Sequence, residues 1–195
     1  MGPPGTGKTL TASVLAGELH LPLMRVVFEG LMSRYLGETA AKLRIIFDSM
    51  EKIPGVYLFD EFDAIGSQRA LQGDVGEIRR VLASFLQLLE QDSSTSLIVA
   101  ATNNPQLLDP ALFRRFDDAV EYSFPADIQI RDLIENRLSP YTTELQDITS
   151  LVDKSRGLSY AELASVCDDA AKEMVLSDAL CITDQHMLKA LAERQ

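Results

Sequence analysis

The first residues of the chain carry a pattern suited to binding phosphate. Gly2-Pro3-Pro4-Gly5-Thr6-Gly7-Lys8-Thr9 fits G-x-x-x-x-G-K-[ST] at every defined position. Glycines let backbone N–H groups curl around phosphate oxygens, the lysine reaches the β- and γ-phosphates, and the hydroxyl can ligate Mg²⁺. An amphipathic stretch follows at once, so the loop faces a helix N-terminus, which favours anions. A chance glycine-rich turn is the alternative, and it leaves this helical pattern unexplained.

A second group of candidate residues ends an apolar run. Val56-Tyr57-Leu58-Phe59 leads directly into Asp60-Glu61. Continuous apolar runs are typical of parallel strands buried on both faces, and ligands gather at the carboxyl ends of such strands. Asp60 would hold Mg²⁺ through water, and Glu61 would polarise an attacking water. A strand followed by Asp-Glu is common by itself, but this one comes about 50 residues after a complete phosphate loop.

Together these motifs predict ATP and Mg²⁺ as ligands. Thr9 and Asp60 are the expected metal ligands, and Lys8 and Glu61 are expected to be catalytic. The residues expected to contact the nucleotide are Pro4, Gly5, Thr6, Gly7, Lys8, Thr9, Leu10 and Asp60.

The pattern of the whole chain predicts an α/β P-loop NTPase fold, with a parallel sheet flanked by helices, followed by a small all-helical lid. The expected strands are Leu23–Phe28, Val56–Phe59, Leu97–Ala101 and Ala119–Phe124. The expected helices of the core run from Gly7-Lys8-Thr9 to about Glu18 and over Thr39–Met50 and Glu77–Gln91. After Pro125 only helices are expected, over Ile128–Leu138, Leu145–Ser155, Tyr160–Leu176 and Thr183–Glu193. We therefore expect an ATPase core over residues 1–125 and a lid over residues 126–195.

Helix starts are marked in the second half. Ser159 and Thr183 are expected N-caps, and Ser159 with Glu162 three residues later matches a capping box.

A strand should precede the phosphate loop, because the loop joins a buried central strand to the following helix. Only Met1 precedes Gly2, so we expect this first strand to be missing and the core to be amino-terminally truncated. Unpaired buried backbone groups cost about 1–3 kcal/mol each. The fragment is therefore expected to aggregate or to bind ATP poorly. In the alternative, the two neighbouring strands pair directly and residues 2–9 form a flexible arm.

The composition limits the classes of partner and the location that are expected for this chain. The net charge is −11, and no stripe of basic residues of the kind that binds nucleic acid is evident, so nucleic acid is not the expected partner. A local basic pore loop within an acidic ring is the alternative. Cys167 and Cys181 stand apart, outside any ligand-like spacing. No apolar run approaches the length of a membrane span and no signal peptide is evident, so a cytoplasmic location is expected.

The chain resembles the AAA ATPases, in particular the branch of protein remodellers that includes katanin, spastin and the membrane-bound AAA proteases. The resemblance covers essentially all 195 residues. Besides the phosphate loop, four segments carry it: Phe59–Gly66, Ala101–Pro105, Leu108–Asp117 and Gly157–Leu163. It implies a homo-oligomeric, hexameric ring that hydrolyses ATP and remodels or unfolds a polypeptide substrate.

Two further sites are implied by this resemblance. Asn103 follows a buried strand, where its amide can contact the γ-phosphate or the attacking water; an ordinary Asn-Pro turn is the alternative. Arg114 and Arg115 fall in the arginine-finger segment, where a guanidinium supplied to a neighbouring subunit neutralises transition-state charge. Which arginine acts is open, and so is a surface pair bonded to Asp117 or Asp118.

Tyr35-Leu36-Gly37 occupies the place of the family's first pore loop, which grips an unfolded chain. The alternative is that Tyr35 packs in the core. A second pore loop could lie in Arg69–Glu77. Leu88–Ser93 departs from the family's Asp-Gly-aromatic triplet, so the relay between subunits is in doubt. A nucleotide-binding scaffold with little turnover, or the ATPase part of a larger protease, are the alternative functions, although the chain has no His-Glu-x-x-His motif.

Overall fold

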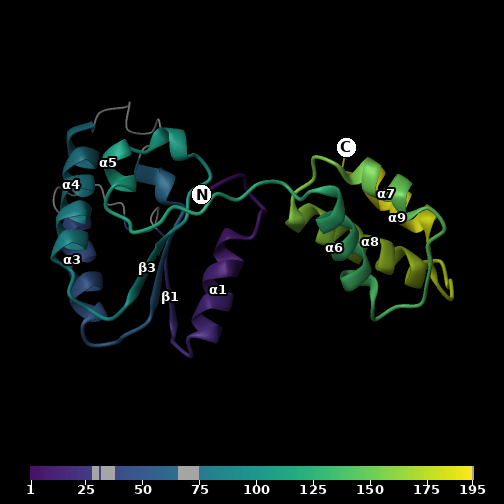
Figure 1. The fold of residues 1–195 in the computed structure, drawn as a ribbon, viewed down its shortest axis with the longest axis horizontal. Helices are drawn as coiled ribbons and strands as arrows, with labels where there is room; N and C mark the ends of the chain where they lie inside the picture. Colours follow the sequence, from purple (N-terminus) through teal and green to yellow (C-terminus); the bar gives the residue numbers. More distant parts are fainter. Residues whose placement is uncertain (28–30, 32–37, 66–74, 195) are drawn as a thin grey trace. The chain divides into compact units, whose positions relative to one another are not determined.

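The computed structural model describes residues 1–27, 31, 38–65 and 75–194, and the chain divides into two compact units (Figure 1). The first unit comprises Met1–Gly2 and Lys8–Glu121, and the second comprises Pro3–Gly7 and Tyr122–Gln195. The phosphate-loop segment is thus grouped with the second unit, whereas the lysine and threonine that end the motif belong to the first.

A parallel sheet lies at the centre of the first unit. Among the described residues it has three strands in the order β1-β2-β3, namely β1 (Leu23–Val27), β2 (Val56–Asp60) and β3 (Leu97–Ala100). In its register Arg25 of β1 pairs with Leu58 of β2, and Leu58 pairs with Val99 of β3. All residues of β2 are buried, as expected for a central strand that reads as a continuous apolar run. The α/β prediction is confirmed.

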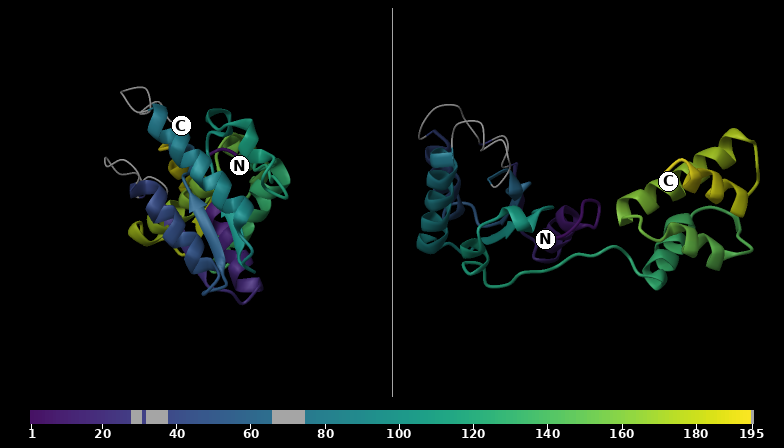
Figure 2. Two further views of the ribbon diagram at one scale, coloured as in Figure 1. Left: turned by 90° about the vertical axis from the view of Figure 1, so that its left-hand side faces the viewer. Right: turned by 90° about the horizontal axis from the view of Figure 1, so that it is seen from above.

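Helices cover both faces of this sheet (Figures 1 and 2). α1 (Lys8–Glu18) lies on one face, and α3 (Glu38–Met50) and α4 (Val75–Gln91) lie on the other. Side chains alternate along β2, so Leu58 packs with Ala12 of α1, whereas Phe59 packs against Phe85 of α4 with ring centroids 5.2 Å apart. The apolar run of β2 is therefore used on both of its faces.

Short helical segments follow the strands. They are the 3₁₀ turns Phe62–Ile65 and Pro105–Leu107, and α5 (Pro110–Phe113). Asp109 caps α5, since its side chain accepts a hydrogen bond from the backbone N–H of Ala111 at 2.8 Å.

The strand expected at Ala119–Phe124 is wrong, because this segment has no regular secondary structure. A strand needs a neighbour with a hydrogen-bonded ladder. The Met1 amine donates to the Val120 carbonyl at 2.7 Å, and the Gly2 N–H donates to the Thr102 carbonyl at 3.2 Å. Met1 and Gly2 therefore form one backbone hydrogen bond each, to Val120 and to Thr102 respectively. A single bond on each side does not make the ladder that defines a strand.

The second unit is mainly helical, as predicted. Its helices are α6 (Asp127–Leu138), α7 (Ile148–Ser155), α8 (Tyr160–Leu176) and α9 (Asp184–Ala192). The sequence did not predict a short parallel pair, β4 (Thr143–Glu144) with β5 (Ile182–Thr183). The helix expected from Leu145 begins at Ile148, because Asp147 acts as its N-cap and accepts from the Ser150 N–H at 2.9 Å.

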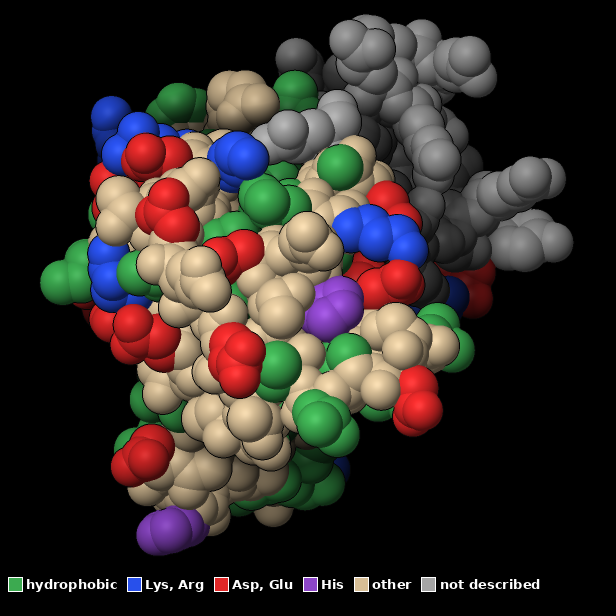
Figure 3. All heavy atoms as spheres, turned by 90° about the vertical axis from the view of Figure 1, so that its right-hand side faces the viewer, with side chains coloured by type: hydrophobic (Ala, Val, Ile, Leu, Met, Phe, Trp, Pro, Cys, Tyr) green, Lys and Arg blue, Asp and Glu red, His purple; other side chains and the backbone are tan. Residues whose placement is uncertain are grey.

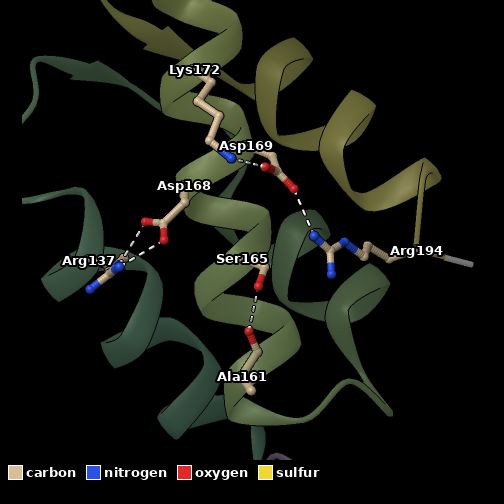
Figure 4. Close-up of polar contacts among 7 residues, drawn as sticks. All are labelled: Arg137, Ala161, Ser165, Asp168, Asp169, Lys172 and Arg194. Carbon is tan, nitrogen blue, oxygen red and sulfur yellow. Dashed lines mark hydrogen bonds and ion pairs between the residues drawn. The ribbon is translucent and has the colours of Figure 1, made fainter.

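Helix α8 organises this unit. Ser159 is its N-cap, and the predicted capping box is confirmed: the Ser159 N–H donates to Glu162 at 2.7 Å, and the Glu162 N–H donates to the Ser159 hydroxyl. Carboxylates of α8 also hold neighbouring segments, as Figure 4 shows for Asp168 with Arg137 of α6 and for Asp169 with Arg194. These pairs are exposed, and pairs of that kind typically contribute below about 1 kcal/mol each.

The surface matches the composition. On the face shown in Figure 3, acidic and basic side chains are interspersed rather than gathered into a basic stripe. Across the described part of the chain, none of the helices is long and apolar enough to cross a membrane.

Candidate active site

The end of β2 presents the two predicted carboxylates in different ways. Asp60 is buried, with 7% of its surface accessible, whereas Glu61 is exposed. Glu61 has a φ of 56°, a left-handed conformation that is uncommon for a residue with a Cβ and costs energy. The Glu61 N–H donates to Asp60 Oδ1 at 3.1 Å. The strand thus ends in a tight turn that exposes one carboxylate and keeps the other beneath it.

The two expected metal ligands lie together. Thr9 Oγ1, in the first turn of α1, donates to Asp60 Oδ2 at 3.2 Å. A hydroxyl and a carboxylate oxygen are hard ligands, and Mg²⁺ is usually held by only one or two protein groups with phosphates and waters completing its shell. No cluster of three or more His, Cys, Asp or Glu occurs within the described ranges. The donor set therefore fits Mg²⁺ bound together with a nucleotide.

Arg25 of β1 is a third member of this cluster, and the sequence reasoning missed it. Its Nε and Nη2 atoms approach Asp60 Oδ2 at 3.1 and 2.8 Å. An arginine inside the apolar run Leu23–Val27 was the available signal. Arg25 lies on β1, the strand next to β2, two residues before Val27, which pairs with Asp60 at the end of β2.

The lysine of the phosphate loop faces the start of its own motif. Lys8 Nζ donates to the Gly2 carbonyl at 2.7 Å. Burial lowers the pKa of the Lys8 ammonium below its usual value, although the charges of Asp60 and Asp63 act in the opposite direction. Lys8 is thus a cation whose charge interacts with the carboxylates of Asp60 and Asp63.

The glycines of the loop are required by its conformation. Gly5 and Gly7 have φ values of 72° and 99°, which side-chain-bearing residues rarely adopt. The Gly5 carbonyl accepts from the N–H of Ala161, in the first turn of α8, at 3.0 Å. A Cβ on Gly5 would lie 2.5 Å from the Ser159 hydroxyl, so a larger residue would strain the backbone and displace the α8 cap. Thr6 is buried and donates to the Pro3 carbonyl at 2.8 Å.

The remaining expected nucleotide contacts, Pro4 and Leu10, are both exposed. Leu10 lies in the first turn of α1 with 68% of its surface accessible.

Asn103 is held by a residue that the sequence reasoning did not assign to the site. Asp63 accepts three hydrogen bonds from the segment after β3: from Thr102 Oγ1 at 3.1 Å, from the Asn103 N–H at 3.3 Å and from Asn104 Nδ2 at 2.8 Å. Burial acts to raise the pKa of Asp63, but the bonds from Asn104, Asn103 and Thr102 outweigh it, so the pKa lies below its usual value. Asp63 thereby ties the turn after β2 to the turn after β3.

The two candidate finger arginines differ in their surroundings. Arg115 forms an ion pair with Glu90 near the end of α4, and not with the Asp117 or Asp118 that the sequence suggested. Arg114 caps the C-terminus of α5 and is exposed, and among the described residues no acidic partner is recorded for it. Neither arginine contacts the cluster around Asp60.

The expected pore-loop residues Tyr35, Leu36 and Gly37 lie outside the described residues, and so does most of the second candidate loop, Arg69–Glu77.

Comparisons with known proteins place these features in a family. The family model described as "ATPase family associated with various cellular activities (AAA)" matches residues 1–124. An uncharacterized AAA family ATPase from Sinorhizobium fredii is 35% identical over 98% of this chain and 58% of its own length. A proteasome-activating nucleotidase from Thermococcus onnurineus is 34% identical over 97% of this chain and 50% of its own length. The chain thus spans about half the length of these curated relatives.

Solved structures agree with the fold. The crystal structure of the FIGL-1 AAA domain in complex with ADP superposes with a TM-score of 0.75 and 25% identity, over 97% of this chain and 68% of that one.

Proposed function

Because this chain belongs to the AAA family of ATPases, we propose that it binds ATP together with Mg²⁺ and hydrolyses it to ADP and phosphate. The observation that carries the proposal is the meeting of Lys8, Thr9 and Asp60 in the first unit, where a cation, a hydroxyl and a carboxylate converge. These are the groups that a phosphate loop and its acidic partner contribute to Mg-nucleotide binding.

Each residue of the cluster has a proposed role. Lys8 neutralises the β- and γ-phosphates, and Thr9 and Asp60 are the residues that would hold Mg²⁺. Bound Mg²⁺ would supply positive charge against the negative charge of the phosphates. Glu61 polarises the attacking water, a role that is supported by its exposed carboxylate directly after the buried Asp60. Asn103 contacts the γ-phosphate or this water, with its backbone fixed by Asp63.

We propose that turnover needs a second copy of the chain. Arg114 is exposed and lies apart from the Asp60 cluster, which suits a guanidinium that completes the site of a neighbouring subunit. Arg115, paired with Glu90, is better placed to hold the loop in position. An arginine that acts on a neighbouring copy needs an assembly of copies, and the resemblance to the AAA ATPases makes a homo-oligomeric, hexameric ring the proposed form.

We further propose that the work is done on a polypeptide in the cytoplasm. The similarity to proteins named proteasome-activating nucleotidase and 26S proteasome regulatory subunit supports a polypeptide substrate. Tyr35-Leu36-Gly37 are the residues proposed to grip it.

Two substitutions test the proposal. Glu61→Gln should bind ATP with little loss and lower turnover roughly 10²-fold or more, because general-base assistance is removed while the phosphate contacts remain. Lys8→Ala should lose ATP binding itself. Binding is measured by isothermal titration calorimetry and turnover by phosphate release. Near-normal turnover of Glu61→Gln would remove Glu61 from its role.

The chain offers matched controls at the end of α3. Glu51→Gln and Lys52→Ala make the same chemical changes at exposed positions, and both variants should bind and hydrolyse ATP as the wild type does.

A further inference from the structure

One oxygen of Asp60 carries an unusual number of donors. Asp60 Oδ2 lies 3.1 Å from Arg25 Nε, 2.8 Å from Arg25 Nη2 and 3.2 Å from Thr9 Oγ1. A carboxylate has about four lone-pair positions over its two oxygens. Asp60 Oδ1 already accepts from the Glu61 N–H. Donors of the protein itself therefore fill Oδ2 of the carboxylate that is proposed to hold Mg²⁺, whereas Oδ1 accepts one bond.

The two partners of this ion pair differ in burial. The Asp60 side chain is 10% exposed, whereas that of Arg25 is 53% exposed. A buried carboxylate is costly unless it is paired with a positive charge and hydrogen-bonded, so Asp60 needs a cation beside it. Arg25 is fixed by its backbone in β1, but its half-exposed side chain can turn into solvent at small cost.

Mg²⁺ and Arg25 would compete at Oδ2 of Asp60. A metal that approaches this oxygen, directly or through a water, needs a free lone pair there, and the Arg25 guanidinium lies against it. It also brings a positive charge that repels a divalent cation. Both effects act in the same direction, so removal of Arg25 should favour the metal.

We propose that Arg25 is the counter-ion of Asp60 while Mg²⁺ is absent, and that Mg²⁺ displaces its guanidinium from Oδ2. Arg25 is thus a positioning residue that keeps the buried Asp60 compensated between nucleotides and raises the Mg²⁺ concentration at which the site fills. This rests on the proposed function, since it takes Asp60 as a ligand for Mg²⁺. If Arg25 instead served to orient Asp60 toward the metal, its removal would weaken Mg²⁺ binding.

The test measures binding and not turnover. The full chain is titrated with Mg²⁺ at a fixed concentration of fluorescent ADP, and the half-saturating Mg²⁺ concentration is read for the wild type, Arg25→Gln and Arg25→Lys. Gln keeps donors but loses the charge, and its value should fall roughly 3- to 10-fold, the range for a charged pair that is partly exposed. Lys keeps the charge but cannot offer two donors at this geometry, so its value should lie between the other two.

Arg44→Gln is the matched control. Arg44 is exposed on α3, so its substitution makes the same change in net charge away from Asp60 and should leave the half-saturating Mg²⁺ concentration unchanged.

A second readout is the thermal midpoint without Mg²⁺. Arg25→Gln should melt below the wild type in EDTA, because Asp60 then loses the cation that is directly paired with it, and the gap should narrow with Mg²⁺ and ADP. Should Arg25→Gln not fold, the Arg25→Lys titration decides alone.

The outcomes separate this inference from the proposed function. A wild type whose ADP binding does not respond to Mg²⁺ would overturn the proposed function. A wild type that responds, with an Arg25 variant that matches Arg44→Gln or needs more Mg²⁺, would overturn the role of Arg25 alone.

Discussion

Substitution of Asp63 by asparagine tests whether the turn after β3 is positioned by one carboxylate. Asp63 accepts from Thr102 Oγ1, the Asn103 N–H and Asn104 Nδ2. An asparagine side chain has one acceptor oxygen, which can keep the first two bonds. Its NH₂ group would then face the Asn104 NH₂ group, so two donors meet where a donor met an acceptor.

The expected loss follows from this geometry. A hydrogen bond to a charged group is worth about 1.5–3 kcal/mol, and Asp63 is partly buried. We expect Asp63→Asn to lower the free energy of unfolding by about 2 kcal/mol, which corresponds to a fall of roughly 4–8 °C in the thermal midpoint for a chain of this size. Because the chain has no tryptophan, melting is followed by circular dichroism. Asp48→Asn, at an exposed position on α3, is the control and should melt with the wild type.

The effect of Asp63 depends on pH. Its pKa lies below the usual value of 3.8 in the folded chain, so the carboxylate stabilises the fold fully above that usual value and the contribution is lost as the pH falls through the folded pKa. The difference between wild type and Asp63→Asn should therefore be constant near neutral pH and shrink below about pH 4.

The substitution of Asp63 should also change the kinetics of ATP hydrolysis. Asp63→Asn should lower kcat more than ATP affinity, because the turn that carries Asn103 loses the bond from Asn104 and is held less firmly, while the Lys8 bond to the Gly2 carbonyl is untouched. A variant that melts within about 1 °C of wild type with an unchanged kcat would refute this reasoning.

Three further predictions concern the loop, the oligomer and the substrate. Gly5→Ala should weaken ATP binding roughly tenfold or more, from backbone strain of about 1–3 kcal/mol, as measured by calorimetric titration. Gly17→Ala, with open space at the added Cβ, should raise the free energy of unfolding by about 0.4–1 kcal/mol, as measured by thermal melting. Arg114→Ala should bind ATP without turnover and recover phosphate release when mixed with Lys8→Ala, since a mixed interface pairs an intact loop with an intact finger; activity that only falls on mixing would contradict this. Tyr35→Ala should hydrolyse ATP yet fail to unfold a tagged substrate in a fluorescence assay, and an unfolded variant would instead make Tyr35 a core residue.

Local signals made part of this structure predictable from the sequence. The continuous apolar run before Asp60 predicts a buried central strand, and β2 is buried throughout. The spacing of Ser159 and Glu162 predicts a helix start, and their reciprocal hydrogen bonds are formed. In both cases the residues that decide the structure lie within a few positions of one another.

Partners that are distant in sequence were missed. Arg25 and Asp60 are 35 positions apart, and Asp63 and Thr102 are 39 apart, and a single sequence carries no sign that such residues pair. The error at Ala119–Phe124 has the same origin. Its apolar residues suit a strand, but a strand depends on the neighbour that supplies its ladder, and the described residues give this segment a single such bond, from the Met1 amine to the Val120 carbonyl.

The central claim is that Lys8, Thr9 and Asp60 form a working Mg-ATP site and not merely a nucleotide-binding scaffold. Steady-state phosphate release by the wild-type chain, measured at saturating ATP over a range of protein concentrations with Mg²⁺ and with EDTA, tests it most directly. Phosphate release should require Mg²⁺, and its rate per chain should rise with protein concentration, because Arg114 acts on a neighbouring copy. A chain that binds Mg-ATP in calorimetry but releases no phosphate at any concentration would contradict it.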